Sequence, residues 1–120
     1  MNIKLFNQIV DYVSHHTQVD EDEMFSRSRK KALVDARYLI IYIARQLDIQ
    51  LIYIQRFFKL KGFELHYTTL FHATNRIGDD IKGDEYMKEV VNSILLQFDP
   101  SKVIAEVSAE VDSDIVNQKN

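Results

Sequence analysis

The scarcity of helix-breaking residues most constrains the fold of this 120-residue chain. It contains three glycines and one proline, and that proline, Pro100, stands near the end of the sequence. Because proline interrupts a helix and glycine weakens one, little before residue 100 forces the backbone out of helical geometry. Apolar residues also recur at helical spacing through most of this stretch. The sequence therefore predicts an all-α fold of about five helices.

The strongest periodicity marks a helix that begins within or just after residues 26–31 and forms the centre of the core. Four further helices are expected: one ahead of the acidic break at 17–23, then 50–58, 67–77 and 84–96. Gly78 is well placed to stop the helix 67–77, and Asp84 to cap the last one. The apolar stripe of the central helix is Ala32, Ala36, Leu39, Ile40, Ile43, Ala44 and Leu47, and that of the first helix is Phe6, Ile9, Val10 and Val13.

Composition indicates one domain with a real core, since 46% of the residues are hydrophobic and 28% are charged. We expect that helical domain over residues 1–97 and a partly disordered acidic tail over 98–120, in which Val103, Val107 and Val111 could support a short amphipathic helix. No cysteine is present, which excludes disulfides and thiolate chemistry. No apolar run suits a signal peptide or a membrane span, so we expect a cytoplasmic protein without membrane contact.

Charge is unevenly distributed along the chain. The net charge is −3, yet residues 26–62 hold nine Lys and Arg against two Asp, a local charge of +7. Such a concentration attracts phosphate backbones, although a solvated helix face balanced by acidic neighbours explains it equally well.

A second pattern indicates DNA binding more directly. The helices 50–58 and 67–77 are joined by a glycine-containing turn, and the second carries a polar face with Thr68, His72, Asn75 and Arg76. In a helix-turn-helix the second helix reads base edges in the major groove from its first turns. Helix pairs with polar outer faces are common, so this pattern alone is weak.

The residues themselves resemble a known family. Residues 66–73 read His-Tyr-Thr-Thr-Leu-Phe-His-Ala, which is similar to the signature Asp-His-Thr-Thr-Val-Leu-His-Ala of the C-terminal DNA-binding domain of bacterial DnaA. The basic run and "Ala-Arg" of residues 28–39, followed by Ala-Arg-Gln-Leu at 44–47, resemble that family's basic loop and long helix. The resemblance covers roughly residues 3–97.

The resemblance implies a Trp-repressor-like helix-turn-helix that binds double-stranded DNA with sequence specificity, in replication initiation or transcription regulation. It implies no cofactor. The DNA-binding residues that it implies fall into four groups. The basic loop on the minor groove and phosphates comprises Arg27, Arg29, Lys30 and Lys31. The major groove is read by Thr68 and Thr69, with His66 and Tyr67 in the family's Asp-His positions. His72 and Arg76 lie near the DNA backbone, and Arg37 contacts phosphate or buttresses the turn.

Three departures from the family set expectations about the target. The Asp-His pair is replaced, the turn is about four residues longer and brings Lys59 and Lys61, and Asn75 stands where a basic residue is usual. We expect Lys59, Lys61 and Asn75 to be DNA-binding residues as well. We therefore do not expect the usual DnaA box to be bound. The Gly-x-x-x-x-Gly-Lys-Ser/Thr loop of an ATPase is absent, which suggests a free-standing domain of phage or mobile-element origin, associated with the nucleoid.

The main alternative is a protein-interaction or self-assembly module that keeps the fold without DNA binding. It would use the acidic termini and exposed Tyr53, Phe57, Phe63 and Phe71, with a replication or transcription protein as the partner. Thr68 and Thr69 could also simply cap their helix. No metal site is expected from the histidines 15, 16, 66 and 72, the acids at 79–80 and 84–85 are ordinary helix-dipole partners, and no residues suggest an enzyme. The oligomeric state stays open.

Overall fold

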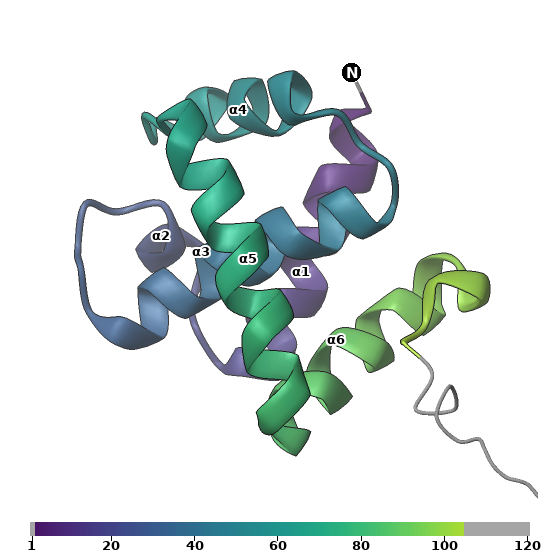
Figure 1. Ribbon diagram of the computed structural model, residues 1–120. Helices are drawn as coiled ribbons and strands as arrows, with labels where there is room; N and C mark the ends of the chain where they lie inside the picture. Colours follow the sequence, from purple (N-terminus) through teal and green to yellow (C-terminus); the bar gives the residue numbers. More distant parts are fainter. Residues whose placement is uncertain (1, 105–120) are drawn as a thin grey trace, which may run out of the picture.

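The computed structural model describes residues 2–104, and in this part of the chain every regular element is helical (Figure 1). The predicted all-α class is confirmed. A short helix, α2, lies inside the acidic stretch that was expected to be a plain break. The elements are α1 (Ile3–Thr17), α2 (Glu21–Met24), α3 (Lys31–Gln46), α4 (Leu51–Leu60), α5 (Tyr67–Gly83), α6 (Glu85–Phe98) and a 3₁₀ turn, η1 (Pro100–Lys102).

The helix α3 is the centre of the core, as its periodicity predicted. It contacts all five other α-helices, and Figure 1 shows α5 crossing over it. Five residues of its predicted stripe are buried, whereas Ala32 is exposed and Leu47 is half-buried at the two ends. Because neighbours cover several sides of the helix, Ile41 and Tyr42 are buried as well, outside the single stripe that periodicity suggested.

The first helix packs its apolar face against both α3 and the helix-turn-helix region. All four residues predicted for this face are buried, and Phe6 stacks on Phe57 of α4 with ring centroids 4.4 Å apart. The helix is capped at its start by Asn2, whose side chain accepts a hydrogen bond from the Leu5 amide. Its end is closed by Gln18 in the left-handed region, at φ 61°.

The expectation that Gly78 stops the fourth predicted helix is wrong. The helix α5 continues through Gly78 to Gly83, and Ile81 extends the buried stripe one turn beyond Ile77. An interior glycine costs a helix only about 1 kcal/mol, which burial of one isoleucine can offset. The predicted cap of the next helix is confirmed, because the Asp84 side chain accepts a hydrogen bond from the Met87 amide.

The segment after α6 folds back onto that helix. Asn92 forms two hydrogen bonds with the backbone of Ile104, and Phe98 packs edge-on against Tyr12 of α1. Val103 is partly buried against the core. Phe98, Val103 and Ile104 belong to the segment expected as an acidic tail, whereas Val107 and Val111 lie outside the described residues.

We predict that Gly78→Ala stabilises the protein by roughly 0.5–1 kcal/mol. A Cβ at this position would lie 3.8 Å from a ring carbon of Tyr42, an ordinary contact, and alanine favours the helix. Urea unfolding of the two proteins measures the difference. Gly62→Ala is the contrasting control: Gly62 has φ +82°, so the same change there should destabilise the fold. A loss of stability in Gly78→Ala would contradict this account of α5.

Candidate nucleic-acid interface

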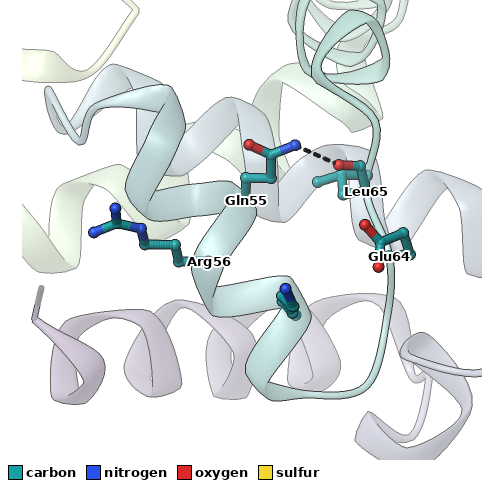
Figure 2. A pocket seen from close by; sticks show the side chains of 5 residues that line it. Gln55, Arg56, Glu64 and Leu65 are labelled. Carbon is teal, nitrogen blue, oxygen red and sulfur yellow. Dashed lines mark hydrogen bonds between the residues drawn. The ribbon is translucent and has the colours of Figure 1, made fainter.

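The helices α4 and α5 are joined by a tight turn that fixes how α5 begins. Gly62 adopts a left-handed conformation, and the Phe63 amide donates to the Phe58 carbonyl at 2.9 Å. The Gln55 side chain then reaches across from α4 and donates to the Leu65 carbonyl at 2.8 Å (Figure 2). Leu65 itself is buried. These contacts hold the last residues before α5 against α4.

The helix α5 has a buried face and a polar face. Leu70, Ala73 and Ile77 point into the core, while Thr68, His72 and Asn75 are exposed and Thr69 is half-buried. His66 is the N-cap residue, and its side chain makes no capping hydrogen bond. Thr68 and Thr69 therefore stand inside the first turn, not at the cap position. The polar face at the start of α5 is directed to solvent.

Arg37 is the one buried charged residue in the described part of the chain, with 6% of its surface exposed. Its guanidinium donates to the carbonyls of Met24 and Ser28 at 2.7 Å each and to that of Ser26 at 3.2 Å. Burial lowers the pKa of this arginine, and the three carbonyls compensate the charge. The guanidinium is thus used to buttress the segment before α3 and is not free to meet a phosphate.

The same guanidinium connects that segment to the helix-turn-helix. It lies over the ring of Phe63, which belongs to the turn between α4 and α5, at 4.7 Å from the ring centroid. The basic loop, residues 25–30, is therefore held beside this turn. The cations that it and the start of α3 present to solvent are Arg27, Arg29, Lys30 and Lys31.

Arg76 of α5 is engaged by acidic groups. It forms ion pairs with Asp35 of α3 and, at 3.4 Å, with Asp80, while Lys31 binds Asp35 at 2.8 Å. Burial raises the pKa of Asp35, but hydrogen bonds from Lys31 and Arg76 outweigh burial and leave that pKa below its ordinary value. Tyr38 completes the contact, since the guanidinium of Arg76 lies 4.8 Å from its ring centroid. The network joins the start of α3, directly after the basic loop, to the middle of α5.

The two turn lysines have different surroundings. Lys61 is paired with Glu21 of α2 at 2.9 Å and is half-buried. Lys59 is exposed and lines a shallow pocket together with Gln55, Arg56, Glu64 and Leu65. Figure 2 shows the Arg56 side chain extending away from Glu64. Arg56 was absent from the residues inferred from sequence. Arg56 lies three residues before Lys59, so the two side chains share an exposed face of α4. That spacing could have placed Arg56 among the DNA-binding residues expected from the sequence.

The aromatic residues expected on the surface divide into three groups. Phe57 is fully buried, so its predicted exposure is wrong: it packs between Phe6 and Phe25. Tyr53 and Phe63 are half-buried. Phe71 is 50% exposed, and its neighbour Tyr67, one turn earlier, is 51% exposed.

Two negative findings concern residues 2–104 alone. Within them, no group of three or more histidine, aspartate and glutamate side chains is arranged to hold a metal ion. None of the helices in residues 2–104 has both the length and the apolar composition of a membrane span.

A core helix, a basic loop buttressed beside it and two helices joined by a tight turn define a helix-turn-helix protein. The family described as the bacterial DnaA protein helix-turn-helix matches residues 6–77. Because the match covers more than half of the chain, the protein belongs to this family, whose helix-turn-helix is a DNA-binding domain. No curated protein and no solved structure matches the chain.

We predict that Arg37→Ala destabilises the fold by about 3 kcal/mol, because three backbone carbonyls lose their donor and a cavity opens beside Phe63. Urea unfolding followed by circular dichroism measures the loss. Arg27→Ala, which removes an exposed arginine from the same segment, is the matched control and should change stability by less than about 0.5 kcal/mol. Equal effects of the two substitutions would show that the buried guanidinium is dispensable.

We predict that Asp35→Asn costs about 1.5 kcal/mol at pH 7 and less at pH 3. A carboxyl whose folded pKa is lowered stabilises the protein above its unfolded pKa, near 3.8, and loses that effect as pH falls through the folded pKa. The measurement is urea unfolding of wild type and variant at both pH values. Asp79→Asn, on the exposed end of α5, is the control. A difference between wild type and Asp35→Asn that is the same at both pH values would contradict the ion-pair network.

Proposed function

We propose that this protein binds double-stranded DNA with sequence preference, placing the start of α5 in the major groove and the basic loop on the phosphates. The observation that carries the proposal is the contact of Arg37 with both the loop carbonyls and Phe63. It holds four exposed cations next to the turn that precedes the recognition helix. A base-reading helix and a phosphate-binding loop must keep a fixed separation to fit one duplex.

The roles of individual residues follow from their exposure and charge. Arg27, Arg29 and Lys30 are exposed cations of the loop and neutralise phosphates, each adding about 0.9 to the slope of log affinity against log salt. Thr68, with its neighbours His66, Tyr67 and Thr69, reads base edges from the first turn of α5, where free backbone amides also favour phosphate.

The remaining polar and basic residues near α5 have supporting roles in the proposed DNA contact. His72 and Asn75 lie one and two turns further along the exposed face of α5 and contact the flanking backbone or bases. Lys59 and Arg56 supply phosphate contacts from α4. Arg76 and Lys61, each paired with a carboxylate, position α5 and the turn.

The biological setting proposed is control of replication or transcription at the nucleoid, which is where such a domain finds its ligand. The chain contains no ATPase phosphate loop, so the residues present can occupy a site without using ATP to open it.

One observation favours a second candidate function, the binding of a protein partner. Tyr67 and Phe71 leave half of their surfaces exposed at the start of α5, and aromatic residues are enriched at protein interfaces. The exposed cations of the basic loop favour DNA as the ligand.

The first test is selection of bound duplexes from a random pool at two salt concentrations. We predict that Arg29→Ala weakens binding to selected and random duplexes alike and lowers the salt slope by about 0.9, whereas Thr68→Ala costs about 1–3 kcal/mol on the selected duplex only. Fluorescence anisotropy with labelled duplexes measures both.

The matched control for the loop is Lys82→Ala, which removes an exposed lysine from the far end of α5 and should leave affinity unchanged. Equal losses on both duplexes for Arg29→Ala and Thr68→Ala would contradict the division of roles. No retention of DNA even at low salt would favour the protein-binding candidate.

A further inference from the structure

The start of α5 carries an unusual apolar feature for a base-reading surface. Tyr67 and Phe71 are spaced four residues apart, so they lie on one side of the helix, and their rings meet edge to face with centroids 5.3 Å apart. They are 51% and 50% exposed. Two large rings are thus held together in solvent within the first two turns of the helix.

The core does not require these rings. The buried residues of α5 are Leu70, Ala73, Ile77 and Ile81, which form a separate stripe, and the two rings lie at its edge and beyond it. Phe71 is flanked by the exposed side chains of His72 and Asn75, so it shares the polar face on which base contacts are expected. The pair leaves apolar surface in water that a ligand can cover.

We propose that Phe71, supported by Tyr67, contacts the C5-methyl group of thymine and makes this protein prefer sites with thymine in the major groove. This inference rests on the proposed function and names what its recognition helix reads. The major-groove edge of DNA consists of hydrogen-bonding groups, with the thymine methyl as the apolar exception. Against polar base edges an aromatic ring would desolvate groups that it cannot pair, whereas against a methyl both surfaces leave water.

The surroundings of the pair select DNA as its occupant. Phe71 is adjacent to His72, whose ring lies 5.9 Å edge-on from Tyr38, and Tyr38 in turn packs on Arg76. Arg76 shares Asp35 with Lys31, the first residue of α3 after the basic loop. Phe71 is therefore next in sequence to a series of packed residues that ends beside the basic loop, which favours a polyanion as the ligand that covers the apolar pair.

The decisive experiment removes a methyl group and nothing else. A duplex recovered by the selection above is synthesised with each thymine in turn replaced by deoxyuridine, and affinities are measured by fluorescence anisotropy at one salt concentration. Wild type should bind about fourfold more weakly when the contacted thymine is changed, the fold-change expected for one buried methyl group. Phe71→Ala should bind the two duplexes equally, and Phe71→Leu should keep part of the difference.

Two control variants test whether the deoxyuridine effect depends on the Phe71 ring in particular. Leu96→Ala removes an apolar side chain of similar exposure, 54%, from α6 and should retain the fourfold difference. Tyr67→Phe keeps the ring without its hydroxyl and should retain it too. Because Phe71 is outside the core, circular dichroism should show that Phe71→Ala folds like wild type.

The outcomes distinguish this inference from the proposed function. Wild-type binding that is indifferent to every deoxyuridine, or a penalty that persists in Phe71→Ala, would overturn the thymine contact while leaving DNA binding intact. A Phe71-dependent gain on duplexes with 5-methylcytosine, without any deoxyuridine penalty, would also overturn it, because the methyl would then come from another base. Failure to retain any duplex would contradict the proposed function itself.

Discussion

The arrangement of the candidate interface depends on one buried cation. Arg37 projects from the central helix and binds three carbonyls of the segment before that helix, while its flat face covers Phe63 of the turn before α5. A guanidinium suits this position because its donors fan out in one plane and its face packs on an aromatic ring. Burying a charge is costly, and here hydrogen bonds offset the cost. The basic loop consequently has a defined place beside the helix-turn-helix.

Pairing with carboxylates divides the basic residues into two kinds. Arg76 and Lys61 are partly buried and hold α5 and its turn against α3 and α2. Arg29 and Lys30 extend into solvent from the buttressed loop. A phosphate would have to displace an existing carboxylate from the first kind but only water from the second. The positive charge of the middle third therefore contributes both to the fold and to the proposed DNA contact, through different side chains.

The two halves of α5 differ in what they contact. Its first half presents Thr68 and Phe71 to solvent, and its second half continues through Gly78 so that Ile81 reaches the core. The next helix starts directly after it at the Asp84 cap. Packing of α5 against α3 and α6 helps to hold its exposed first half in position. A rigid helix of this kind can hold side chains at a fixed depth in a groove.

Local sequence determined the helices, most core faces, the Asp84 cap and the family to which the chain belongs. These features follow from residue spacing and short motifs, which act over one or two helical turns. Only the tertiary structure decided that Arg37 turns inward, that Phe57 is buried under Phe6, and that Lys61 pairs with Glu21, forty residues away. The same holds for Gly78, whose tolerance depends on burial of Ile81 by neighbouring elements. Periodicity shows which face of a helix is apolar, but the partners of a side chain are set by packing between elements distant in sequence.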